Sequence, residues 1–505
     1  MSEAALKQDA LGFRQAFTLS VASPAPGYAL AVSLGVLVAT ASLKTPAVLI
    51  LGFGLMLMSA VAGYFLNRVD PDCGTVFQWA RRAVGPAGGF IGGLLVVVAG
   101  ILLTGILAQT AAYYFFQLVD WHSAANSTTG LNIATVIVMV LVTVVAYLGI
   151  QLSAKTEMVL LWYQILTLLL LAIVAIVKII SGDAPQSSVD FSMAWLSPFG
   201  MGSEALVQGV LLGVFMYAGW ETALTVAEET RNPRRTCGRA SISALCALLV
   251  IYLFVCSALI AFAGPQFLAK FGEAGALDAV SKLVLGSSLA KLVIIAVLLS
   301  SLATAESAIL AQARIVLSMS RQGALPRAFS KIHQRFLTPS TGTIFAGVSA
   351  GVWLIFFIYA SETFLFDSIT AAGLVYAGFY GLIALSGLVY YRHKMFTSAK
   401  AFVLTGVLPA LGTAGFLAVA IKECVDLARH DPEISTYWLG VQPPLVIAAA
   451  ILAVGIGTVV IGKLVGGRYF VAKTERPDAM LLRDEDEPVA AMVSVGEAPI
   501  EAVTG

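Results

Sequence analysis

The sequence carries little charge. Asp, Glu, Lys and Arg make up 12% of its 505 residues, and apolar residue types make up 59%. About 25% charged residues is usual in a soluble protein. A water-soluble fold of this size cannot hide so much apolar surface, which excludes an ordinary cytosolic enzyme and predicts a lipid bilayer as the solvent. The net charge of +1 gives no bulk attraction for nucleic acid, so we expect no nucleic-acid partner.

Cysteine and histidine are also sparse. The chain has five cysteines and four histidines. The odd cysteine count, with no paired spacing, predicts neither a disulfide framework nor a zinc site, and the histidines fall in separate predicted loops. The sequence holds no catalytic constellation, so we expect no enzyme activity, no metal and no cofactor. The N-terminus lacks the residue order of a removable signal peptide, which predicts that the first apolar segment stays in the mature protein.

Long apolar runs are the main positive feature. A helix needs about 20 mostly apolar residues to cross a bilayer. These runs are too long and too continuous for the strands of a membrane barrel. They predict an all-α polytopic membrane protein with 12 transmembrane helices, at residues 17–40, 46–67, 88–118, 131–149, 157–180, 203–226, 239–262, 290–318, 342–360, 364–390, 402–421 and 443–465.

Basic residues predict the orientation of the chain. With a cytoplasmic N-terminus, most of the 30 lysines and arginines fall on the cytoplasmic side, as the positive-inside rule requires. We therefore expect a multi-pass protein of the plasma membrane, such as a bacterial inner membrane, with both termini in the cytoplasm. The sequence leaves the oligomeric state open. The predicted parts are an N-terminal tail (1–16), spans one to five (17–180), spans six to ten (203–391), spans eleven and twelve (402–466) and an acidic, disordered tail (467–505).

Two predicted spans contain helix breakers. The first holds Pro24, Pro26 and Gly27, and the sixth holds Gly219 followed by Glu221. Prolines remove a backbone donor and clash with the preceding turn. Irregular backbone at membrane depth is tolerated only against protein or a wet cavity, and paired discontinuous helices indicate a transporter's substrate site. The alternative is that these residues merely kink the helices.

Three motifs resemble one family. Gly219-Trp220-Glu221 with residues 227–235, the stretch 71–86, and the stretch 313–326 resemble segments of the amino acid–polyamine–organocation (APC) superfamily. The resemblance implies a leucine-transporter-type fold, in which residues 17–180 and 203–391 form a 5+5 inverted repeat with discontinuous first and sixth helices. It also implies a small-molecule substrate, either an amino acid, a polyamine or another amine.

The resemblance implies a substrate site between the two breaks. Phe215 falls where an aromatic ring caps the substrate in the family, although it could equally be packing bulk. Glu221 falls at an acidic position linked to proton response, and Glu306 is the other carboxylate inside a span; each could instead be a structural carboxylate. Tyr376 and Tyr380 either line the path or pack against other rings. The substrate-binding residues expected from the two breaks are Ser23, Ala25, Gly27, Tyr28, Phe215, Tyr217, Ala218 and Gly219.

The sequence departs from the family pattern in two places. Many members have Gly-Ser-Gly before the first break, whereas this chain has residues 23–27, Ser-Pro-Ala-Pro-Gly, whose prolines offer no N–H. This leaves room for an amine substrate. Several proton-coupled members have a lysine midway along the fifth helix, where this chain has Gln164. Proton coupling then needs another group, exchange becomes more plausible, and sodium coupling through Thr304 and Ser307 is the weaker alternative.

These features predict a secondary active transporter of amino acids or related amines, working by alternating access through proton-coupled symport or exchange. A polyamine or inorganic-cation transporter is the alternative within transport. A non-transporting nutrient sensor or a channel on the same scaffold is the alternative of another class. One charge cluster at the cytoplasmic end of the sixth span is either a solvated face or an inner gate closed by Arg81 or Arg321; it comprises Glu228, Glu229, Arg231, Arg234 and Arg235.

Overall fold

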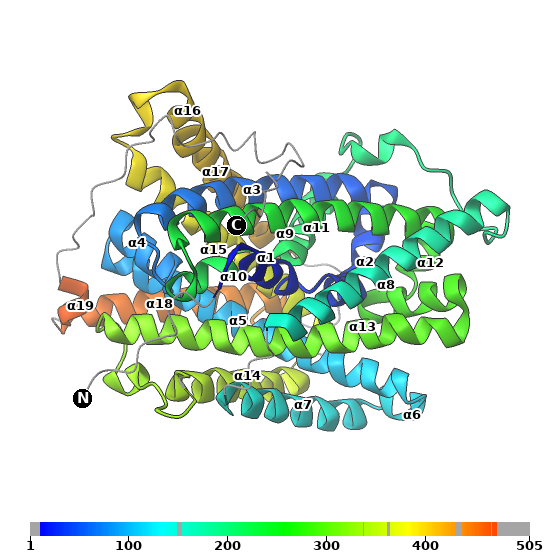
Figure 1. Cartoon of the computed structure of the whole chain (residues 1–505), viewed down its shortest axis with the longest axis horizontal. Coiled ribbons are helices and arrows are strands. Elements are labelled where there is room, and N and C mark those ends of the chain that lie inside the picture. The colour runs from blue at the N-terminus through cyan, green and yellow to red at the C-terminus, as the bar shows by residue number, and fades with distance from the viewer. Residues whose placement is uncertain are drawn as a thin grey trace, which may run out of the picture.

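The computed structural model describes residues 11–148, 154–336, 338–360, 364–429, 437–465 and 467–471. Within these residues the regular structure is helical, apart from two isolated β-bridges, Leu11–Thr230 and Trp438–Val441. The predicted all-α class is confirmed (Figure 1). Most of the predicted acidic tail, including residues 484–487, and residues 1–10 of the predicted N-terminal tail lie outside the described residues.

Two sets of helices follow each other along the chain, and each begins with a short, interrupted pair. The first set is α1 (Phe13–Ala22), α2 (Pro26–Ala41), α3 (Thr45–Val69), α4 (Val76–Val84), α5 (Pro86–Leu118), α6 (His122–Ala125), α7 (Thr128–Leu148) and α8 (Ala154–Ser181). The second set is α9 (Ser203–Tyr217), α10 (Thr222–Thr225), α11 (Pro233–Ala263), α12 (Pro265–Ala269), α13 (Gly272–Arg321), α14 (Ser340–Ala360) and α15 (Phe364–Tyr391). They are followed by α16 (Ala399–Ala401), α17 (Leu408–Leu427), α18 (Pro443–Leu464) and α19 (Arg468–Val471).

Nine helical stretches of the described residues are long and apolar enough to cross a membrane. They make the chain a multi-pass membrane protein. The predicted spans 17–40 and 46–67 both lie within one of these stretches, Phe13–Val69. The predicted spans 203–226 and 342–360 overlap two shorter apolar helices, Ser203–Tyr217 and Ser340–Phe356, and the count of twelve spans stays a prediction.

Some helix limits differ from the predicted ones. The first helix begins at Phe13 rather than at residue 17, because the Gln15 side chain accepts the Gly12 N–H at 3.0 Å and caps the helix earlier, and Ala16 is buried. The predicted span 290–318 lies inside α13, whose one non-helical residue is Gly286, with φ of 78°. The predicted span 402–421 opens with a π-helix, Phe402–Val407.

The arrangement buries the two interrupted pairs. α1 and α10 lie in the middle of the bundle, whereas α7 and α14 lie together at one edge (Figure 1). α7 presents a row of exposed apolar side chains, as expected of a helix that faces lipid: Ile133, Ile137, Val140, Leu141 and Val144. The central helices thus have protein, and not lipid, around their irregular backbone.

Candidate functional site

The helices are interrupted at two points. α1 ends at Ala22 and α2 begins at Pro26, with Ala25 between them in the left-handed region at φ of 50°. α9 ends at Tyr217 and α10 begins at Thr222. Proline has no N–H to continue a helix and is favoured at a helix start, which explains why α2 begins where it does.

The two interruptions touch each other. A Cβ placed on Gly219 would lie 2.7 Å from Ser23 Oγ and 3.1 Å from the Pro24 nitrogen. Gly219 has φ of 108°, a conformation that side chains rarely adopt. The Thr222 hydroxyl donates to Ser23 Oγ at 2.8 Å, which joins the two segments through side chains as well. Glycine is therefore required here both for its conformation and for the close approach.

Glu221 is held beside this contact by one of its oxygens. The Tyr380 hydroxyl, on α15, donates to Glu221 Oε2 at 2.7 Å. The Gly219 N–H reaches the same oxygen at 3.2 Å and the Tyr380 hydroxyl at 2.9 Å. Both side-chain contacts thus use Oε2, the backbone N–H of Glu221 also bonds to its own carboxylate, and the residue is partly exposed. Oε2 is therefore anchored, and Oε1 accepts from neither Tyr380 nor Gly219.

Aromatic rings pack on one another beside Glu221. The Tyr376 ring stacks on Tyr380 with centroids 5.8 Å apart, and the Phe215 ring lies 6.4 Å from Tyr376. The Trp220 ring also stacks on Tyr380, with ring centroids 5.6 Å apart. Glu221 lies close enough to Tyr376 and Tyr380 to interact electrostatically with both side chains. The fold therefore brings Phe215 and Glu221, from the sixth predicted span, against tyrosines of the tenth.

Tyr28 joins this group from the other interruption. Its side chain is 2% exposed, and its hydroxyl has no hydrogen-bond partner among the described residues. The Tyr28 side chain lies close enough to Tyr376 to interact with it electrostatically. The Tyr217 ring packs against other residues, with its centroid 5.3 Å from that of Tyr252 and 6.1 Å from that of Phe53. Of the two tyrosines expected to bind substrate, Tyr28 is the one that lies beside the Glu221 group.

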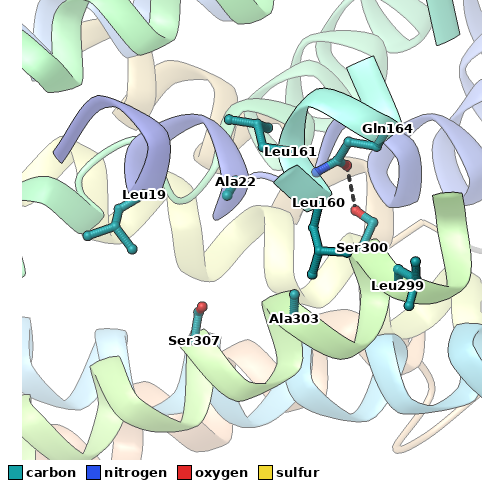
Figure 2. A pocket seen from close by; sticks show the side chains of 9 residues that line it. All are labelled: Leu19, Ala22, Leu160, Leu161, Gln164, Leu299, Ser300, Ala303 and Ser307. Carbon is teal, nitrogen blue, oxygen red and sulfur yellow. Dashed lines mark hydrogen bonds between the residues drawn. The ribbon is translucent and has the colours of Figure 1, made fainter. Parts of the chain in front are cut away.

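Gln164 joins the start of α2 to α8 and α13. Its Oε1 accepts the Gly27 N–H at 3.3 Å. The same oxygen accepts the Ser300 hydroxyl at 2.8 Å (Figure 2). Nearby, the Thr304 hydroxyl donates a hydrogen bond to the Ala22 carbonyl at 3.3 Å, which links α13 to the end of α1. The Gln164 side chain thus connects α8 to α2 and α13 by hydrogen bonds.

A pocket opens next to Gln164. It has an empty volume of about 400 Å³, open solvent included, and its wall combines the end of α1 with one face each of α8 and α13 (Figure 2). None of its lining residues is charged; they are Leu19, Ala22, Leu160, Leu161, Gln164, Leu299, Ser300, Ala303 and Ser307. Glu306, buried on α13, is the neighbour in sequence of the lining residue Ser307.

Comparison with known proteins identifies the family. Residues 11–458 match the amino acid permease family. The chain belongs to this family. The predicted membership of the APC superfamily is confirmed, and the family is one of transporters and not of enzymes.

Several relatives of this permease resemble it at low identity. An uncharacterized transporter of Mycobacterium tuberculosis is 30% identical over 60% of this chain and 66% of its own length. The methylthioribose transporter of Bacillus subtilis is 25% identical over 56% of this chain and 61% of its own length. The D-serine/D-alanine/glycine transporter of Escherichia coli is 23% identical over 70% of this chain and 75% of its own length. The match to the first two relatives spans less than two thirds of their length.

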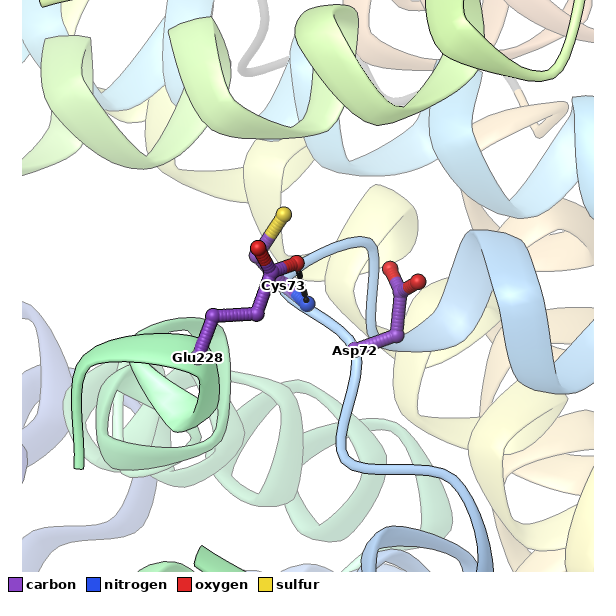
Figure 3. A group of neighbouring side chains, drawn as sticks. All are labelled: Asp72, Cys73 and Glu228. Atoms are coloured by element: carbon purple, nitrogen blue, oxygen red, sulfur yellow. Dashed lines mark hydrogen bonds between the residues drawn. The ribbon is translucent and has the colours of Figure 1, made fainter. Parts of the chain in front are cut away.

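The permease has a group of possible metal ligands, Asp72, Cys73 and Glu228, whose ligand atoms lie within 4.8 Å of one another (Figure 3). Their carboxylate oxygens already have partners. Glu228 Oε1 accepts the Cys73 N–H at 3.2 Å and Oε2 lies 3.7 Å from Arg321, while Asp72 accepts from Gly74, Gln78 and Ser318. Burial is the main cause that raises the pKa of the Cys73 thiol well above its usual value. The group is a hydrogen-bonded junction and not an open metal site.

This junction belongs to a larger closure at the cytoplasmic end predicted for the permease. The predicted partner Arg321 does face Glu228, and Arg314 pairs with Glu229 at 2.9 Å. Arg81 instead donates to Gln322 at 2.8 Å. The segment before α1 adds backbone bonds: the Leu11 N–H donates to the Glu229 carbonyl at 3.0 Å, and the Arg231 N–H donates to the Leu11 carbonyl at 2.8 Å. The end of α13 and the N-terminal segment thus both hold residues 228–231.

Three residues at the site of the permease are not predicted by any motif. Ser20 accepts the Ala223 N–H at 3.2 Å, Thr222 bonds to Ser23, and Ser300 bonds to Gln164. Hydroxyl side chains are common inside membrane helices because they can bond to their own backbone. Their position within apolar spans therefore gave no signal that they bridge separate helices.

Proposed function

We propose that this permease is a secondary active transporter of amino acids or related amines in the plasma membrane. In this proposal α1 with α2 forms the first of twelve crossings and α9 with α10 forms the sixth, with the N-terminus in the cytoplasm. The observation that carries the proposal is the contact between Ser23 and Gly219, where two interrupted helices meet beside a carboxylate. Interrupted helices of this kind expose backbone groups to a substrate at the membrane midplane.

The substrate would bind between residues 23–28 and 215–221. The name of one relative supports this class, since it carries D-serine, D-alanine and glycine; the relative that carries methylthioribose, a thio-sugar without an amine, does not. Alternating access would consist of opening the closure around residues 228–231 while the outer side closes. Because Gln164 carries no charge, Glu221 is the group that we assign to proton coupling; exchange of one substrate for another needs no such group.

Counterflow in proteoliposomes tests this function. Purified protein is reconstituted with unlabelled substrate inside, and uptake of labelled amino acids and amines is followed with and without a proton gradient. We expect uptake to depend on internal substrate or on the gradient, and Glu221→Gln to flatten its pH dependence. Binding without flux would identify a sensor, and conductance that ignores internal substrate would identify a channel. Either result would contradict the proposal.

A further inference from the structure

Several backbone amides at the two interruptions are bonded to other groups of the protein. An α-amino acid carries a carboxylate, which needs N–H donors where helices break. The Ala25 N–H donates to the Ala22 carbonyl at 3.0 Å, and the Gly27 N–H donates to Gln164. The Gly219 N–H donates to Glu221 and Tyr380. Pro24 and Pro26 have no N–H at all.

Charge at the site has one sign. Glu221 is a carboxylate, and the pocket beside Gln164 has no charged residue in its wall. A substrate carboxylate placed beside Glu221 would meet a like charge without a compensating cation, and burial of such a charge without donors is costly. A single carboxylate suits a substrate with one positive charge better than it suits a polyamine.

The rings beside Glu221 suit a cation. Tyr380 meets the carboxylate with its hydroxyl and stacks on Tyr376, and the Phe215 ring lies 6.4 Å from Tyr376 at an angle of 60°. The faces of aromatic rings attract ammonium groups. The Tyr28 hydroxyl is buried without a partner among the described residues and lies beside Tyr376. Glu221 Oε1 is the carboxylate oxygen that does not bond to Tyr380.

We propose that the substrate of this site is a monovalent organic ammonium without a carboxylate. Its ammonium would donate to Glu221 Oε1 within the ring group formed by Tyr28, Phe215, Tyr376 and Tyr380. The inference rests on the proposed function, because it takes the meeting point of the two interruptions to be the transport site. It selects simple amines over the α-amino acids from which they differ by one carboxylate.

Matched ligand pairs test the inference on the unmodified, full-length protein. Binding is measured by calorimetry and thermal shift in detergent, which avoids the leakage of amines through lipid. The pairs are ethanolamine and serine, isoamylamine and leucine, and phenethylamine and phenylalanine. We expect at least one amine to bind with a Kd at least about tenfold below that of its amino acid. Tighter binding of the amino acids, or binding of no amine, would overturn the inference.

Two variants locate the binding. Glu221→Gln keeps an acceptor for Tyr380 and Gly219 but removes the charge, and we expect it to weaken amine binding about tenfold or more. Asp120→Asn, at an exposed ion pair with Lys291, is the control and should bind amines as the unmodified protein does. Equal amine affinity in Glu221→Gln and the unmodified protein would contradict the assignment. The paired ligands keep the inference testable even if this variant does not fold.

Counterflow measurements show whether the inference or the proposed function has failed. If amines bind as expected and counterflow is absent, the substrate class stands and transport does not. If labelled amino acids show counterflow and amines neither bind nor compete, transport stands and the substrate class is wrong.

Discussion

At the scale of single residues, the close contact between Gly219 and Ser23 explains why the sixth predicted span is broken. The sequence already indicated this break, because a glycine and a carboxylate stood in the middle of an apolar run. It could not indicate that the glycine touches Ser23, since the two residues are far apart in the chain and only the packing of α1 against α10 brings them together.

Gly219→Ala tests this contact. The new Cβ would lie 2.7 Å from Ser23 Oγ on a backbone with φ of 108°. We expect a loss of about 1–3 kcal/mol in the free energy of unfolding and a strong loss of uptake. Thermal unfolding and proteoliposome uptake measure the two effects. Gly54→Ala is the matched control, because a Cβ at Gly54 meets nothing within 4 Å; equal behaviour of both variants would argue against the contact.

Phe215→Ala tests the ring group. Removing this ring takes one face from the proposed site, so we expect the apparent substrate constant to rise about fivefold with little change in maximal rate. Phe115→Ala is the control, since Phe115 is exposed on α5 at a position expected to face lipid. Concentration-dependent uptake measures both variants. An unchanged substrate constant in Phe215→Ala would move the ring out of the site.

At the scale of elements, residue patterns predicted the breaks better than their connections. Pro24, Pro26 and Gly219 lie at the junctions between α1 and α2 and between α9 and α10, and that each pair forms one discontinuous membrane helix stays a prediction. Gln164 was expected at a coupling position through the family resemblance, yet its bonds to Gly27 and Ser300 depend on how α8, α2 and α13 pack. Hydrogen bonds between distant helices have no local sequence signature, so this part of the site could not be predicted.

The loop between α3 and α4 has a pH dependence of its own. Burial raises the pKa of Asp70 to about 6, against a smaller lowering by Arg82 at 2.9 Å. Because the carboxyl binds its proton more tightly in the folded protein, its contribution favours folding below pH 4 and is lost as the pH rises to about 6. Relative to Asp70→Asn, the unmodified protein should lose up to about 3 kcal/mol of stability over this range.

Thermal or denaturant unfolding of both proteins between pH 4 and 7 measures this difference. The comparison with Asp70→Asn cancels the titration of the other groups. A stability difference that stays constant, or that moves in favour of the unmodified protein as pH rises, would contradict the raised pKa of Asp70.

At the scale of the whole molecule, residues 228–231 join the segment before α1 to the end of α13, and we propose that this closure shuts one end of the protein. Glu229 and Arg314 are both largely buried, and removing one member of a buried ion pair leaves the other charge uncompensated. Cys73 lies behind this closure and is 1% exposed. Its thiol therefore reports opening of this end.

Arg314→Gln should favour the open state. We expect the rate of maleimide labelling at Cys73 to rise at least about tenfold, as measured by mass spectrometry of the peptide that contains it. Arg335→Gln, at an exposed position outside the closure, should leave the rate unchanged. Equal labelling in the two variants would mean that the Glu229–Arg314 pair does not hold the closure.

The composition was sufficient to predict a helical membrane protein, and three motifs were sufficient to predict its family. The substrate is harder to infer, because it depends on which donors and acceptors remain free after the helices have packed. Here the buried side-chain groups without a partner among the described residues include the Tyr28 and Tyr217 hydroxyls and the Trp220 indole N–H, and none of them could be identified from the order of residues.

The central claim is that substrate binds where the two interrupted helices meet. An experimental structure with a bound substrate, chosen from the ligand pairs by its affinity, tests this claim most directly. We predict density for the ligand between residues 23–28 and 215–221, in contact with Glu221. Density for the ligand elsewhere, with continuous helices through Ser23 and Gly219, would contradict the account.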